Sequence, residues 1–297
     1  MDRFSQTIEL RDGRKLGYAE FGNSEGKPIF YFHGNPGTRT EAKISDITLS
    51  EKNARIISVD RPGFGLSDFK KNRTILDWTD DVEELADSLG FSKFSILGVC
   101  GGAPYVLACA YKIPQRCQSV GIIAGMSPIN RITRKLEGVS KRIVFVNKRL
   151  PLVFRFYFWY KMARHARSKN ESKIRRKMLA HVTKNFSKPD KKLLNKPKII
   201  DILCERMRDI GRISTKGAVY DRKLIFRSWG FQLEEISQKV KVFLWQGHFD
   251  KTVPISIGKY MAEKIPNCEA KFFPDEGHLS VCVNKMVYIT NNLSSGL

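Results

Sequence analysis

Long apolar runs are missing from this sequence of 297 residues. Its most apolar stretches, such as VFRFYFWY and VGIIAGM, are far shorter than the about 20 residues that span a bilayer. The first 15 residues contain neither an apolar core nor a small-residue cleavage site. We therefore expect no secretory signal and a cytoplasmic location.

Paired cysteine motifs are also missing. None of the six cysteines forms a C-x-x-C pair, so neither a zinc site nor a redox motif is indicated. An even cysteine count in a chain without a predicted signal indicates reduced, buried thiols rather than disulfides. Only Cys100 occupies a position that asks for a chemical explanation.

Acidic residues are scarce in one long segment. Residues 127–230 contain 29 Lys and Arg but 7 Asp and Glu, a net charge of +22, which is the formal charge of the whole chain. A general enrichment in lysine would have spread this charge along the sequence. The basic segment is therefore a chemically distinct unit.

What the sequence does contain is an alternation of short apolar runs and helix-length amphipathic segments. Continuous apolar runs rich in β-branched residues are typical of central parallel strands, which helices cover on both faces. The pattern predicts a doubly wound, mostly parallel α/β sheet. We expect strands near 5–10, 15–21, 28–34, 55–60, 94–99, 120–125, 240–245 and 270–274, and helices near 40–50, 74–90, 101–112, 255–265 and from 280.

The alternation stops after Met126 and resumes at Val240. The intervening residues show helical periodicity, prolines and lysines, and no convincing strand. We interpret them as a helical lid inserted after the sixth strand. The expected organisation is a core of residues 1–126 and 231–297 with a basic lid of residues 127–230 that is not an independent domain.

The segment GVCGG, residues 98–102, joins a predicted strand to a predicted helix. A reactive side chain on such a sharp turn needs small residues two positions before and after it. The helix that follows directs N–H groups and its positive dipole end toward Cys100, which favours the thiolate. The turn predicts a nucleophile; the alternative is a buried, unreactive cysteine in a glycine-rich turn.

Two more polar residues follow predicted strands. Asp250 ends the segment WQGHFD, and His278 ends DEGH. Nucleophile, acid and histidine in this order, each after a strand, predict a catalytic triad. His278 would take the proton from Cys100, and Asp250 would orient and stabilise the imidazole.

The segment HGNPG, residues 33–37, follows another predicted strand. A loop in this position can direct the N–H of Asn35 toward a developing oxyanion, with the N–H of Gly101 as second donor. The alternative is a turn that merely ends the strand. We expect His33 to be a structural hydrogen-bonding residue.

Together, HGNPG, DRPGFGLS (60–67), GVCGG, GHFD and EGH resemble the α/β-hydrolase superfamily, with spacing similar to its lidded esterase-like and haloperoxidase-like members. The segment 216–231 also resembles the lid exit of bacterial relatives. The resemblance implies hydrolysis of a carboxylic ester or related acyl bond by Cys100, Asp250 and His278, without metal or organic cofactor.

The cysteine departs from the serine usual in this family, although dienelactone hydrolases and polyhydroxyalkanoate synthases also resemble this chain in using cysteine. Three interpretations stay open: a hydrolase of esters or thioesters, an acyltransferase that works through an acyl-cysteine, and a catalytically impaired binding protein. The elbow excludes the aspartate nucleophile of dehalogenases and epoxide hydrolases.

Aromatic and basic residues adjoin each other in residues 149–177. We favour a lid that covers a pocket for a small apolar or anionic acyl substrate and turns its charges to water. The alternative is peripheral contact with an anionic membrane. No recognised nucleic-acid module is present, so we expect no specific nucleic-acid partner.

Overall fold

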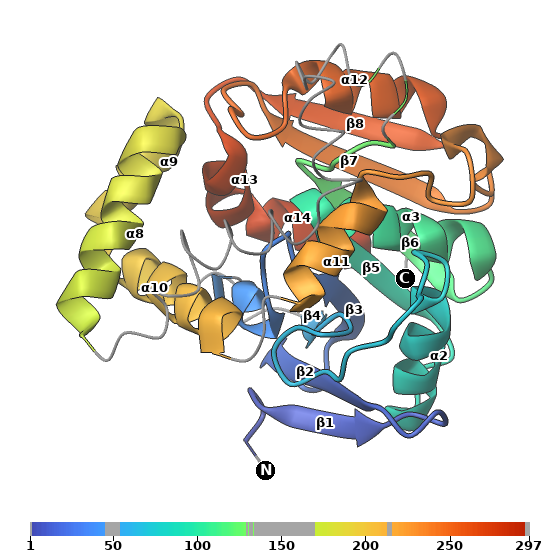
Figure 1. Cartoon of the computed structure of the whole chain (residues 1–297). Coiled ribbons are helices and arrows are strands. Elements are labelled where there is room, and N and C mark those ends of the chain that lie inside the picture. Colours follow the sequence, from blue (N-terminus) through green and yellow to red (C-terminus); the bar gives the residue numbers. More distant parts are fainter. Residues whose placement is uncertain are drawn as a thin grey trace.

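The computed structural model describes residues 2–44, 54–128, 130, 133, 170–212 and 216–294. In these residues, eight strands form one sheet in the order β1-β2-β4-β3-β5-β6-β7-β8 (Figure 1). β1 is antiparallel to β2, and β2 to β4, whereas β3 to β8 are parallel. The strands are β1 (Gln6–Glu9), β2 (Lys15–Gly22), β3 (Lys27–Phe32), β4 (Ala54–Val59), β5 (Phe94–Val99), β6 (Cys117–Ile123), β7 (Lys241–Gly247) and β8 (Cys268–Phe273).

The burial of the strands explains their sequence pattern. All six residues of the central strand β5 are buried, so both of its faces need apolar side chains. The edge strand β8 instead alternates between half-buried and exposed residues over most of its length. All eight predicted strands are confirmed, with ends within about three residues of those expected.

Helices cover both faces of the sheet. α3 (Ala103–Lys112) and α12 (Ile255–Lys264) share one face, where a side chain on Gly125 would contact Ala103 and Met261. α14 (Met286–Ser294) lies on the other face, where Leu293 is next to Gly121. The predicted α/β-hydrolase fold, a doubly wound, mostly parallel sheet, is therefore confirmed.

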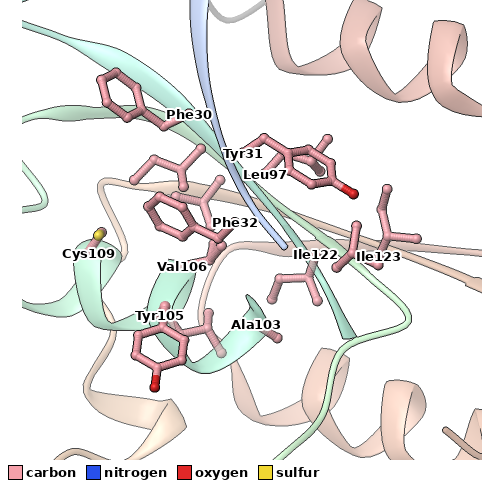
Figure 2. Packing of buried hydrophobic residues seen from close by; sticks show 14 of the residues in the cluster. Phe30, Tyr31, Phe32, Leu97, Ala103, Tyr105, Val106, Cys109, Ile122 and Ile123 are labelled. Carbon is pink, nitrogen blue, oxygen red and sulfur yellow. The ribbon is translucent and has the colours of Figure 1, made fainter. Parts of the chain in front are cut away.

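The main core lies between the sheet and these helices. Figure 2 shows Phe30 and Phe32 of β3 on one side of the strand, with Phe32 near Tyr105 and Cys109 of α3, while Tyr31 points to the opposite side. This alternation follows from the two-residue period of a strand. The Tyr31 hydroxyl therefore lies on the other face of the sheet, where it donates to Glu41.

Most of the predicted helices are confirmed. The residues expected as helices near 74–90, 101–112 and 255–265 form α2 (Trp78–Ser88), the short helix η2 (Cys100–Gly102) with α3, and α12. The closing helix is two helices, α13 (His278–Asn284) and α14. The segment expected as a helix at 40–50 contains η1 (Arg39–Ala42), and residues 45–50 lie outside the described residues.

Helices also fill the described part of the chain between β6 and β7, as expected for an insertion after the sixth strand. Met178, Val182 and Leu203 of this region belong to a second apolar cluster, which Leu279 and Val283 of α13 join. The division of the chain at residues 126 and 231 stays a prediction. The helices are α8 (Glu171–Asn185), α9 (Lys188–Lys192), η4 (Leu193–Asn195), α10 (Pro197–Arg212), α11 (Lys216–Ile225) and η5 (Leu233–Glu235).

The described helices contain no segment long and apolar enough to cross a membrane. In Figure 1, α8 and α9 lie to one side of the molecule, and α13 lies between α9 and the sheet.

Candidate active site

Cys100 stands on a strained turn between β5 and the helix that follows. Its φ is 52°, in the left-handed region that a residue with a side chain rarely adopts. Glycines are required on both sides of the turn. A Cβ on Gly98 would lie 2.4 Å from Val106 Cγ2, and one on Gly102 would lie 2.3 Å from the carbonyl oxygen of Phe32. This geometry is that of a nucleophile elbow.

His278 and Asp250 form a hydrogen-bonded pair at the same edge of the sheet. His278 Nδ1 lies 2.8 Å from Asp250 Oδ2. The other carboxylate oxygen, Oδ1, accepts from the backbone N–H groups of Thr252 (2.7 Å) and Val253 (2.9 Å). Because a carboxylate only accepts, Nδ1 carries the proton, and Nε2 is the ring atom that remains for Cys100.

The electrostatics of the imidazole depend on two neighbours, Asp250 and Cys100. Burial lowers the pKa of His278. The Asp250 carboxylate and the charge and hydrogen bond of Cys100 raise it by more than burial lowers it, so the pKa lies well above the ordinary value. Arg222 of α11 also interacts electrostatically with Cys100. Burial lowers the pKa of Arg222, and the charge of Cys100 opposes that effect.

The predicted oxyanion donors lie against each other. Phe32 and Gly98 pair at the ends of the adjacent parallel strands β3 and β5, and the chain continues from there to Asn35 and Gly101. A Cβ on Gly101 would lie 3.0 Å from the backbone nitrogen of Asn35 and 2.8 Å from its Cβ. The two backbones therefore meet beside Cys100, although their role as donors stays a prediction.

A buried polar network holds the loop that carries Asn35. Asn35 Nδ2 donates to Asp221 of α11 at 2.9 Å. Asp221 is fully buried and also binds Arg61 (3.0 Å), Arg73 (2.9 Å) and the hydroxyl of Tyr105. Burial raises the pKa of Asp221, but the charges of the two arginines hold it well below the usual range.

His33 belongs to the same network and has no access to solvent. Its Nδ1 lies 2.7 Å from the carbonyl oxygen of Gly34, so Nδ1 donates, while Nε2 accepts from the backbone N–H of Arg61 at 3.3 Å. Burial and the charge of Arg61 hold the pKa of His33 well below its ordinary value. The structure places His33 in a structural role, as its sequence context predicted.

A cavity of about 200 Å³ opens beside Cys100 and His278. Val182 of α8, Phe186 just after this helix, and Leu203 of α10 are part of an apolar wall. Its surface is therefore mainly apolar and suits an acyl group.

An ion pair forms the polar part of the cavity wall. Arg206 of α10 lies 2.9 Å from Glu41 and donates to the carbonyl oxygen of Pro36 at 2.6 Å. Glu41 in turn accepts from the hydroxyl of Tyr31 (3.1 Å) and from the N–H of Gly34 (2.9 Å). The charge of Arg206 is thus already balanced by a buried carboxylate.

Among the described residues, no group of three or more His, Cys, Asp or Glu side chains is arranged to hold a metal ion. The described cysteines are all free. Burial raises the pKa of the five other than Cys100, to about 12 for Cys117 and about 11 for Cys268.

The structure brings Cys100, Asp250, His278, Asn35 and Gly101 to one edge of the sheet, as expected. Sequence reasoning missed Arg61, Asp221, Arg206 and Asp190. Arg61 and Asp221 stand in the segments 60–67 and 216–231, which were quoted for their resemblance but given no role. Asp190 stands three residues after Ser187, a capping-box spacing that marks the start of α9.

Most of the aromatic and basic segment 149–177 lies outside the described residues; its last part, residues 170–177, is described. Lys173, Arg175, Arg176 and Lys177 in α8 are exposed. Only Arg175 of these has an ion pair among those described, to Asp201 at 2.7 Å.

The sequence matches a family profile over most of its length and individual curated proteins over a shorter part. A family profile described as the alpha/beta hydrolase fold matches residues 27–284. Proline iminopeptidase of Xylella fastidiosa (strain 9a5c) is 29% identical over 123 residues, 40% of this chain and 39% of that protein. The match thus spans well under half the length of that curated relative.

Solved structures cover nearly the whole chain. An esterase from Exiguobacterium antarcticum has a TM-score of 0.70 and 18% identity over 98% of both chains. A bromoperoxidase from Bacillus anthracis has a TM-score of 0.70 and 18% identity over 97% of this chain and 98% of its own. At this identity the likeness shows the fold. With the nucleophile elbow and the profile match over residues 27–284, it shows that the chain belongs to the α/β-hydrolase fold family.

Proposed function

We propose that this protein hydrolyses carboxylic ester or thioester bonds through Cys100, His278 and Asp250. The observation that carries the proposal is the 2.8 Å contact between His278 Nδ1 and Asp250 Oδ2, with His278 and Cys100 side by side on the wall of one apolar cavity. Each residue has the chemistry that its place in a nucleophile–base–acid triad requires.

The raised pKa of His278 suits a reaction that starts from a thiolate and an imidazolium. Cys100 Sγ attacks the carbonyl carbon, and the backbone N–H groups of Asn35 and Gly101 stabilise the oxyanion. The bond to the leaving group then breaks, and His278 gives its proton to the departing alcohol or thiol. Neutral His278 next takes a proton from water, the hydroxide attacks the thioester, and the thiolate leaves with the acid as product.

The same thioester allows two other outcomes. If an alcohol or amine reaches it before water, the protein is an acyltransferase. If sulfur, which is larger than oxygen, does not fit a site shaped for serine, the protein is a catalytically impaired member of the family that binds ligands. The second alternative predicts that Cys100→Ser restores turnover.

The cavity favours an apolar acyl group over an anionic one. Its volume of about 200 Å³ suits a short chain, and its wall from α8 and α10 is mainly apolar. Arg206, its main cation, is already paired with Glu41 at 2.9 Å. A free carboxylate on the substrate would therefore find no unbalanced positive charge at this side chain.

The curated relatives add one further substrate class. They are named proline iminopeptidase, and one solved neighbour is an esterase. An N-terminal prolyl amide is therefore the alternative substrate for the same triad. A thiol ester intermediate forms less readily from an amide than from an ester, because the amide is the weaker electrophile and its amine the poorer leaving group.

The test is a substrate series with matched cysteine variants. Turnover of p-nitrophenyl esters from acetate to octanoate, and of prolyl p-nitroanilide, is measured for the wild type, Cys100→Ala and Cys109→Ala. We expect turnover of short esters by the wild type and Cys109→Ala, and none above background by Cys100→Ala. Unchanged ester turnover in Cys100→Ala would contradict the proposal. Faster cleavage of the anilide than of all esters would identify a prolyl amide, rather than an ester, as the substrate class.

A further inference from the structure

An aspartate from the insertion caps the helix that begins with His278. Asp190 of α9 is fully buried. Its carboxylate accepts from three successive backbone N–H groups at the start of α13: His278 (3.2 Å), Leu279 (2.9 Å) and Ser280 (2.8 Å). These are the N–H groups that a helix cannot satisfy internally, and a negative charge there also interacts favourably with the helix dipole.

The contact between α9 and this helix is close. Ser187 Oγ donates to Asp190 at 2.6 Å and belongs to the same cluster. A Cβ on Gly277 would lie 2.1 Å from Ser187 Oγ and 2.5 Å from Asp190 Oδ2. The residue before His278 must therefore be a glycine for α9 to reach this position.

Helix α13 also lies between two apolar clusters. Leu279 and Val283 belong to the cluster of the insertion, whereas Val281 and Cys282 belong to the main core. The place of His278 thus depends on packing from both sides, and Asp190 fixes the end of the helix where the imidazole stands.

We propose that Asp190 is a positioning residue for His278. Its carboxylate holds the first turn of α13 so that the imidazole reaches both Asp250 and Cys100, and the site is complete only while the insertion is docked. The proposal rests on the proposed function for the role of His278. A misplacement of about 1 Å in a catalytic group reduces a rate by about 100-fold, so a loose first turn is enough to have an effect.

Asp190→Asn tests this proposal because it keeps the side-chain shape but turns an NH₂ group toward the N–H donors. The matched control is Asp201→Asn, an exposed acid of α10 whose side chain is 65% exposed. Three readouts are compared: the low-field Nδ1–H proton resonance of His278, the alkylation rate of Cys100 by iodoacetamide, and kcat and KM for p-nitrophenyl acetate.

We expect Asp190→Asn to lose the low-field resonance, to slow alkylation, and to lower kcat by about 10- to 100-fold with KM within about twofold. Asp201→Asn is expected to match the wild type in all three. Should Asp190→Asn not fold, Ser187→Ala removes one donor to the carboxylate and is expected to shift the readouts less, in the same direction.

A lower melting temperature with unchanged resonance, alkylation rate and kcat would overturn the proposal, since Asp190 would then only stabilise the fold. The resonance and the alkylation rate do not depend on turnover. If the wild type has no esterase activity, these two readouts still decide the role of Asp190 while the proposed function fails by itself.

Discussion

The core and the insertion differ in the distribution of charge and in what their acidic residues do. Outside residues 127–230 the chain has equal numbers of basic and acidic residues, and this part carries Cys100, Asp250 and His278. The insertion carries the net charge of +22 with seven acidic residues. Two of these seven, Asp190 and Asp221, are fully buried and bind groups of the site.

This contrast separates two roles within one segment. We propose that the exposed lysines and arginines in the described part of the insertion influence which molecules approach it, because surface charges act through solvent. Its buried carboxylates attach it to the core at the histidine helix and at the loop of Asn35.

The largest effect is expected for Asp250→Asn in the core. The amide can no longer favour the Nδ1–H tautomer or stabilise the imidazolium of His278, and kcat for a short ester should fall by about 10⁴-fold. Asp275→Asn, at an exposed acid in the loop just before α13, is the control and should retain wild-type kcat. A loss below tenfold for Asp250→Asn would show that the pair is not part of the catalytic machinery.

The attachment at α11 is tested by Asp221→Ala. Removal of this carboxylate leaves Arg61 and Arg73 as buried, uncompensated charges, which lowers the free energy of unfolding by about 3–5 kcal/mol. Urea denaturation measures the change, with Asp201→Ala as an exposed control expected to stay within about 0.5 kcal/mol. A change under about 1 kcal/mol for Asp221→Ala would mean that the network contributes little to stability.

The coupling of His278 to Cys100 is tested by the titration of His278. The raised pKa means that the folded protein keeps this proton above pH 6.5, where an ordinary histidine has lost it. The stabilisation is therefore fully present below that pH and is lost as pH rises through the folded pKa. Cys100→Ala removes the charge and hydrogen-bond contributions of Cys100 that raise the pKa of His278, so NMR titration should show a lower pKa. An unchanged or higher value would refute the coupling.

Cys100 and the other five cysteines are expected to differ in their reactivity toward alkylating reagents. Burial raises the pKa of the five cysteines other than Cys100, whereas Cys100 is the cysteine whose charge and hydrogen bond raise the pKa of His278. Iodoacetamide at neutral pH should therefore modify Cys100 first, as peptide mass spectrometry can show. Modification of the more exposed Cys268 before Cys100 would indicate that access, and not the site, controls reactivity.

The smallest effect is expected at the surface of the insertion. As the alternative to a lid that only covers the pocket, we propose that residues 149–177 contact anionic membranes, with exposed cations such as Lys173 and Arg176 as part of the contact. Co-sedimentation should be several-fold greater with anionic than with neutral vesicles and should weaken as salt increases. Charge reversal at Lys173 and Arg176 should reduce it; equal binding to both kinds of vesicle would rule out an electrostatic contact.

Much of the fold could be predicted from the sequence because its signals are local. The apolar runs that form β5 and β6 predict strands without reference to the strands they pair with. The glycines around Cys100 likewise predict a strained turn from the local sequence alone. Cys100, Asp250 and His278 each stand just after the carboxyl end of a predicted strand, so the predicted sheet brings them to one place.

The attachment of the insertion could not be predicted because its signals are not local. Asp190 binds N–H groups 88 to 90 positions later, and Asp221 binds an arginine 160 positions earlier. Along the chain, each is one acid in a basic helical segment, and only the fold shows that it is buried. The spacing of Ser187 and Asp190 indicates the start of a helix, but not the second helix that Asp190 caps.

The central claim, that Cys100 is a working nucleophile, is tested most directly by intact-mass analysis after brief exposure to p-nitrophenyl acetate. The account predicts an acetyl adduct on the wild type that is absent from Cys100→Ala and that decays as product forms. Transfer of this acetyl group to added alcohols or amines faster than to water would identify an acyltransferase. A wild type with neither adduct nor turnover, beside a Cys100→Ser variant that gains activity, would contradict the claim.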